Sequence, residues 1–77
     1  MLKFDIMIRS LRDVQDFVSL AARQPFGITV GNESQRIDGK DFMGMFSLDY
    51  SRPVQVQVQC SQEEYSRFRK NAAKFLV

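Results

Sequence analysis

Apolar and polar residues alternate along two stretches of the chain, and this spacing is typical of strands with one buried face. The strictest alternation runs from Val54 to Cys60, where three valines and the cysteine alternate with three glutamines. An antiparallel sheet with one face in water produces that pattern. In residues 2–8 the predicted inward positions are Leu2, Phe4, Ile6 and Ile8.

A hairpin is predicted between these two strands. Phe26, Ile28 and Val30 alternate as a further strand, and Gly31 to Ser34 has turn chemistry. A short strand around residues 35–38 would complete the hairpin.

The spacing of apolar residues predicts a first helix. Ser10 precedes it as a potential N-cap, with Asp13 three residues later. Pro25 cannot continue a helix, so this one should end near Arg23. Its apolar stripe is Val14, Phe17, Val18 and Ala21.

A final helix has a stronger start signal. Ser61 and Glu64 form the S-x-x-E capping box, and the cations that follow suit a helix C-terminus. We predict that its buried stripe is Tyr65, Phe68, Ala72 and Phe75.

The segment of residues 39–53 is too long and too apolar for a plain loop. A short helix capped by Asp41 fits it. The elements then follow the order βαββαβα, which predicts an α+β open-faced sandwich: a four-stranded antiparallel sheet covered by three helices. A chain of 77 residues has room for one domain, residues 1–77.

Composition excludes several kinds of chemistry. The sequence has no histidine, the commonest general base and metal ligand. Its single cysteine, Cys60, cannot form an internal disulfide or a Cys-rich metal site, and we expect a small buried hydrophobe there. No cofactor or metal is implied. Without a transmembrane-length apolar run or a signal peptide, we expect a soluble, cytoplasmic protein with no role at a membrane.

The segment from Gly39 to Leu48 resembles the K-S-I-M-G-V-M-S-L motif of HPr, the small phosphocarrier of the bacterial sugar phosphotransferase system. Five residues match it outright, and three others keep their apolar character; the five are Lys40, Met43, Gly44, Ser47 and Leu48. The element order agrees with the HPr fold. The resemblance covers nearly the whole chain and implies that fold.

The resemblance also implies where a phosphate acceptor would lie. HPr carries its phosphoacceptor histidine in an H-A-R-P motif, and the same register here begins at Ser10 and retains Arg12, with Asp13 in place of proline. A phosphoserine ester cannot pass its phosphate onward as phosphohistidine does. We therefore expect phosphotransfer by the usual route to be lost, and no enzyme activity.

A second HPr site is a regulatory serine that caps the short middle helix, and Asp41 stands at that position. Asp41 either caps the helix or mimics phosphoserine, and both interpretations remain open at this point. The resemblance implies that Phe42 and Phe46 form a partner-docking patch together with Arg12 and Asp41. Met43 should contribute less, because it can point inward.

These observations predict a non-catalytic, HPr-like regulatory or binding protein of bacterial carbohydrate metabolism. Its partner would be a catabolite-control-type regulator or a component of the phosphotransferase system. A phosphocarrier that uses a non-histidine site is one alternative. Exposed edge strands leave a homodimer possible.

A basic nucleic-acid-binding module is the other alternative. The cations Arg67, Arg69, Lys70 and Lys74 cluster near the C-terminus, although the net charge is only +2. The simplest interpretation of the cluster is a solvated helix face. RNA-binding sheets need aromatic residues on the open face, where this sequence places Gln55, Gln57 and Gln59. We therefore expect no direct contact with nucleic acid.

Overall fold

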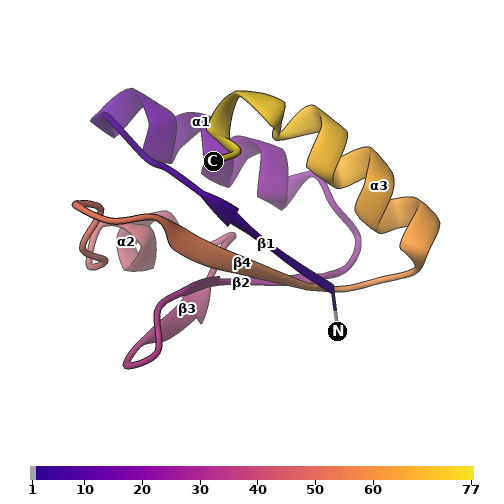
Figure 1. Cartoon of the computed structure of the whole chain (residues 1–77), viewed down its shortest axis with the longest axis horizontal. Helices are drawn as coiled ribbons and strands as arrows, with labels where there is room; N and C mark the ends of the chain where they lie inside the picture. The colour runs from indigo at the N-terminus through magenta and orange to yellow at the C-terminus, as the bar shows by residue number, and fades with distance from the viewer. Residues whose placement is uncertain (1) are drawn as a thin grey trace.

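The structure is a computed structural model that describes residues 2–77, and one antiparallel sheet organises it (Figure 1). The strands are β1 (Leu2–Ile6), β2 (Gly27–Gly31), β3 (Arg36–Asp38) and β4 (Val54–Gln59). Their order across the sheet is β1-β4-β2-β3, and each neighbouring pair is antiparallel. The strand with the strictest alternation, β4, is therefore central, where its valines meet the core.

Helices cover one face of this sheet and leave the other open (Figure 1). α1 (Leu11–Ala22) and α3 (Gln62–Asn71) lie side by side above it. The short α2 (Phe42–Met45) packs against α1 and β3. The predicted α+β open-faced sandwich is confirmed. Within residues 2–77, every helix is too short or too polar to cross a membrane.

Aromatic rings fill the space between the helices and the sheet. The Phe17 ring meets Phe68 edge-on at 6.2 Å and Phe75 at 5.6 Å, between ring centroids. The valines of β4 and Ile6 of β1 complete this layer with little or no exposed surface. The alternation of apolar and polar residues in the sequence thus corresponds to alternating buried and more exposed side chains in the strands.

The chain departs from the predicted elements at both ends of the core. β1 ends at Ile6, yet Ile8 is still buried. The final helix ends at Asn71. Ala73–Phe75 then forms a 3₁₀ turn, which places the Phe75 side chain in the core. The Met7 amide then donates to the Phe75 carbonyl oxygen at 2.8 Å, which ties the two ends of the chain together.

Several predicted core positions pack against the core but are only partly buried: Leu2, Val18, Phe26, Cys60 and Tyr65. Tyr65 is half-buried, because its hydroxyl reaches the edge of the sheet and donates to the Lys3 carbonyl oxygen at 3.0 Å. Cys60 follows the last residue of β4 and packs against the core as a small hydrophobe, but it is only half-buried rather than buried as expected. Burial and, secondly, the nearby Glu64 carboxylate raise the pKa of the Cys60 thiol.

Candidate docking site at helices α1 and α2

The N-terminus of α1 is closed by its own side chains. Ser10 is the N-cap, and its Oγ accepts a hydrogen bond from the Asp13 amide at 3.1 Å. The Asp13 carboxylate in turn accepts from the Arg9 amide at 3.0 Å. Two amides that could otherwise bind an external anion at this helix end are therefore already satisfied.

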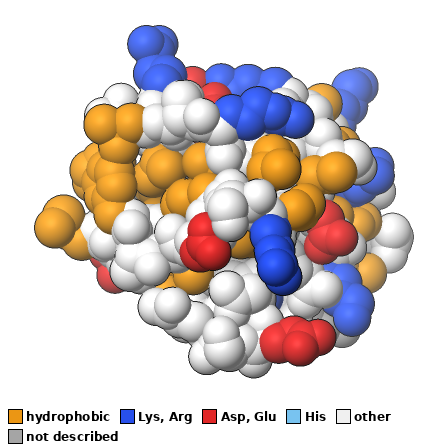
Figure 2. All heavy atoms as spheres, turned by 60° about the vertical axis from the view of Figure 1, so that its left-hand side comes forward, with side chains coloured by type: hydrophobic (Ala, Val, Ile, Leu, Met, Phe, Trp, Pro, Cys, Tyr) orange, Lys and Arg blue, Asp and Glu red, His pale blue; other side chains and the backbone are white. Residues whose placement is uncertain are grey.

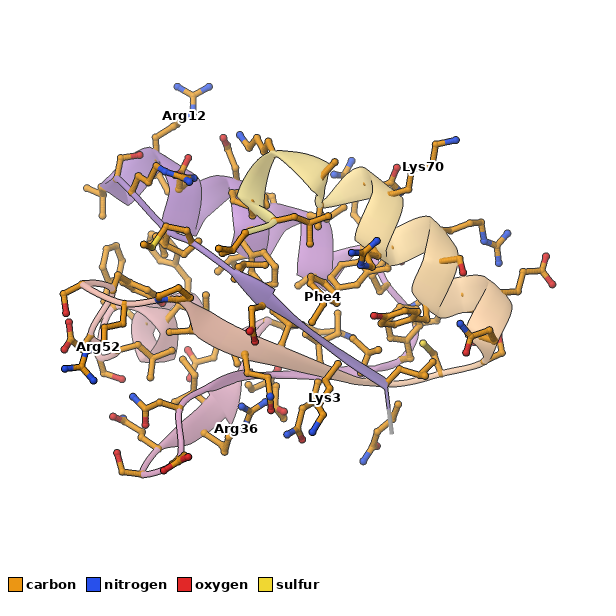
Figure 3. The ribbon with its side chains drawn as sticks, in the orientation of Figure 1. Lys3, Phe4, Arg12, Arg36, Arg52 and Lys70 are labelled. Atoms are coloured by element: carbon orange, nitrogen blue, oxygen red, sulfur yellow. The ribbon has the colours of Figure 1, made fainter. Side chains whose placement is uncertain are left out.

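Arg12 extends into solvent from α1 and points away from α2 (Figure 3). Its side chain is 81% exposed, and its Nε donates to the Asp16 carboxylate at 3.4 Å. Lys74 contacts the same carboxylate at 2.6 Å. The hydrogen bond from Lys74, more than that from Arg12, holds the pKa of Asp16 below its ordinary value. Arg12 therefore belongs to an ion-pair network in the helical layer rather than to the surface of α2.

Asp41 caps α2 as the sequence predicts. Its Oδ1 accepts a hydrogen bond from the Gly44 amide at 3.1 Å. Any Cβ at position 44 would lie 2.8 Å from Asp41 Oδ2, so glycine leaves the space that this cap needs. The carboxylate also remains exposed to solvent, where a partner could reach it.

Large apolar side chains are exposed where α1 begins and along α2, and we call them the α1–α2 patch: Leu11, Phe42, Met43 and Phe46. The rings of Phe42 and Phe46 pack edge-on, with centroids 4.7 Å apart. Figure 2 shows a broad apolar area on the left of its view, with Lys and Arg side chains above it.

Met43, which the sequence also predicts to belong to the partner-docking patch, is its most exposed member, at 75%, so the inward orientation that would reduce its contribution is not seen. Met45 takes the inward position and has no exposed surface. The reason is the geometry of a single helical turn: Phe42 and Phe46 share one side because they are four residues apart, and Met45 with Leu48 faces the core.

A hollow of about 330 Å³ joins α1 to this patch. Ser10 and Leu11 line it from one side, and Phe46 lines it from the other. Tyr50 also lines it, and the Tyr50 hydroxyl donates to the Met45 carbonyl oxygen. Burial raises the pKa of Tyr50 to about 12. The hollow is thus mainly apolar, with a neutral phenol at neutral pH.

Comparison with solved structures finds proteins with a similar fold. HPr-C-His from Thermoanaerobacter tengcongensis aligns with a TM-score of 0.76 and 22% identity, over 96% of this chain and 92% of that one. A phosphocarrier protein HPr from Bacillus anthracis str. Ames aligns with a TM-score of 0.67 and 16% identity, over 87% of this chain and 90% of that one. The chain has the HPr fold. No protein-family model and no curated protein matches the sequence.

On this HPr fold, the predicted site residues divide into two groups. Ser10 and Phe46 line one hollow, and Phe42 and Met43 extend the apolar surface beside it. Arg12 lies apart from them, in its contact with Asp16. In the part of the chain that the structure describes, no three His, Cys, Asp or Glu side chains gather as a metal site would require.

Sequence reasoning missed Leu11, which is 58% exposed at the first position of α1. A large apolar residue directly after an N-cap, outside the buried stripe, was the available signal. It also missed Arg36, which lines two hollows of about 530 and 400 Å³ on the open sheet face, away from the α1–α2 patch.

Proposed function

We propose that this protein is a non-catalytic, HPr-like regulatory or binding protein of bacterial carbohydrate metabolism, acting in the cytoplasm. It binds a protein partner through the α1–α2 patch. The observation that carries the proposal is the group of exposed apolar side chains around the hollow beside Ser10. The partner is a catabolite-control-type regulator or a component of the phosphotransferase system, as the resemblance of the Gly39–Leu48 segment to the HPr motif implies.

The composition of the patch suits reversible binding to a protein. Phe42 and Phe46 are 37% and 42% exposed, so a partner would gain free energy only by covering the apolar surface that remains on them and on the more exposed Leu11 and Met43. Because association itself has a large entropic cost, such a small apolar patch suits weak, reversible binding. Methionine adapts to different partner surfaces because its side chain is unbranched and flexible. Met43 is also the most exposed side chain of the patch, so a partner that covers the patch can bury it most.

Three features argue against a carrier function. The sequence contains no histidine, and the Ser10 hydroxyl is engaged as the N-cap of α1. The Asp13 carboxylate also accepts a hydrogen bond from the Arg9 amide, directly before Ser10, so its negative charge would repel an incoming phosphate. These observations support binding without phosphate transfer.

The structure also weakens the nucleic-acid alternative. Among the described residues, the exposed aromatic side chains are Phe42 and Phe46, both in or next to α2. The open face presents glutamines, and two of them contact one another, with Gln57 Nε2 donating to Gln55 Oε1 at 2.8 Å. A sheet that stacks bases would need aromatic rings there.

The test is a calorimetric titration of the protein into the catabolite-control-type regulator and into phosphotransferase components of its source organism. Met43→Glu should weaken binding at least about tenfold, or ~1.4 kcal/mol. Val77→Glu is the matched control, because Val77 is also 75% exposed but lies outside the patch. The proposal would be contradicted if the protein bound none of these proteins, or if Met43→Glu and Val77→Glu changed the binding affinity equally.

Asp41→Asn separates the two roles of Asp41. If the carboxylate mimics phosphoserine, removing its charge weakens binding while the amide oxygen still caps α2. If Asp41 is only a cap, Asp41→Asn binds like the parent. Circular dichroism of both proteins checks that the fold is unchanged.

A further inference from the structure

The open face of the sheet carries four charged residues in a regular arrangement. In one row across the strands, Lys3 of β1 pairs with Gln57, which pairs with Thr29, which pairs with Asp38 of β3. In the neighbouring row the order is Asp5, Gln55, Gly31 and Arg36. Each edge of the face therefore has one cation and one anion, in opposite order.

These four side chains are exposed and lack an ion-pair partner within residues 2–77, where both salt bridges lie in the helical layer. Figure 3 shows Lys3 and Arg36 on the side of the sheet that faces away from the helices. Arg36 leans over Thr29, to which its Nη2 donates at 2.9 Å (Oγ1) and 3.1 Å (carbonyl oxygen). These are the only hydrogen bonds of the Arg36 side chain within residues 2–77.

This arrangement is complementary to itself. If a second copy is placed face to face about a two-fold axis along the strands, Lys3 meets Asp38 and Asp5 meets Arg36. If the axis runs across the strands, Lys3 meets Asp5 and Arg36 meets Asp38. Opposite charges face one another in both cases, which is the requirement for a two-fold interface in which the same surface is used twice.

We propose that the open face of the sheet binds the open face of a second copy of this chain, forming a two-fold symmetric dimer. Glutamines and small residues fill the centre of the interface, where side-chain amides can both donate and accept across the axis. Such a polar interface gives weak, salt-sensitive association. The α1–α2 patch lies elsewhere and stays free for a partner.

Strand-to-strand pairing is a poorer route to a dimer. On the outer edge of β1, the Lys3 carbonyl oxygen is occupied by Tyr65, and Ile6 is bridged by Leu76. The other edge strand, β3, has only three residues. Short and covered edges resist pairing with another chain.

The test is sedimentation equilibrium over a concentration series up to millimolar, with charge-exchanged proteins. Lys3→Glu/Arg36→Glu gives an all-negative face, and Asp5→Lys/Asp38→Lys gives an all-positive face. Each of these two variants alone should self-associate at least about tenfold more weakly than the parent, since like charges would then face one another. An equimolar mixture of the two should associate again. Arg67→Glu/Lys70→Glu makes the same change in net charge as Lys3→Glu/Arg36→Glu, but on the helical layer, and should behave like the parent.

Monomeric parent protein throughout the series would overturn the proposal. So would self-association of either exchanged protein at the parent level, because that would locate the contact on another surface. Circular dichroism confirms folding of each variant. The single variant Lys3→Glu replaces any pair that fails to fold, because within residues 2–77 the Lys3 side chain makes no hydrogen bond or ion pair that the substitution would break.

Discussion

Tyr50 connects the α1–α2 patch to the core. Its phenol lines the hollow and donates to the carbonyl oxygen of Met45, whose side chain is fully buried beneath the patch. Replacing Tyr50 with Phe leaves that carbonyl oxygen without its donor, so we expect a loss of about 1 kcal/mol in the free energy of unfolding. Urea denaturation measures it. Tyr65→Phe is the matched control, with a smaller loss, because the Lys3 carbonyl oxygen can be hydrated instead.

The raised pKa of Tyr50 also predicts that the protein loses stability at alkaline pH. Burial raises its pKa from an ordinary 10.0 to about 12, so the folded state favours the neutral phenol. This contribution to stability is complete below pH 10 and is lost as the pH rises towards 12. The unfolding free energy of the parent should therefore fall across this range. Tyr50→Phe should fall less steeply, and equal slopes would contradict the burial of the phenol.

At the scale of elements, α3 owes its start to a complete capping box. The Ser61 amide donates to the Glu64 carboxylate at 3.0 Å, and the Glu64 amide donates to Ser61 Oγ at 3.1 Å. Ser61→Ala should lower the free energy of unfolding by about 1 kcal/mol. Ser66→Ala, an exposed change inside the same helix, should be neutral or slightly stabilising. Thermal or urea unfolding of the two variants would refute this account if their effects were equal.

The three helix caps were predictable from the sequence because each depends on residues within one turn. Ser10, Asp41 and Ser61 all cap as expected. The orientation of α2 was not predictable, because a four-residue helix has no repeated stripe to set its rotation, and Met43 and Met45 are chemically equivalent. Only the packed structure decides which of them is buried.

The open-face charge pattern was missed for a different reason. Alternation places Lys3 and Asp5 on the open face, but their relation to residues of β3 depends on the register of three strand pairs. No local signal fixes that register. The overall fold was more accessible, since alternation, helical spacing and the HPr-like segment all pointed to one arrangement.

At the scale of the whole molecule, Asp16 links α1 to the C-terminal segment through Lys74, with Arg12 as a second cation. Its pKa is lowered, chiefly by the hydrogen bond from Lys74. The stabilisation is therefore present above the ordinary pKa of aspartate and is lost as the pH falls through the lowered value. Asp16→Asn should be less stable than the parent at neutral pH and equal to it in strong acid. Urea denaturation at both pH values measures this difference, and a difference that is the same at both pH values would contradict a stabilising ion pair.

The C-terminal segment closes the core. Phe75 is 2% exposed, packs edge-on against Phe17, and provides the carbonyl oxygen that accepts the Met7 amide. Phe75→Ala removes a buried aromatic ring and should lower the free energy of unfolding by about 3–5 kcal/mol. The core of a domain below about 80 residues rarely supplies more than about 3–5 kcal/mol of net stability, so the variant should be partly unfolded at physiological temperature.

Val77→Ala, two residues further along and 75% exposed, provides the control for Phe75→Ala and should unfold like the parent. Amide hydrogen exchange then locates the damage. If the segment closes the core, Phe75→Ala removes the ring contact with Phe17 and releases the turn whose backbone carbonyl oxygen accepts the Met7 amide, so exchange should accelerate next to β1 and in α1 together. Faster exchange confined to Ala73–Phe75 would instead mean that this turn is an appendage and that the core is complete without it.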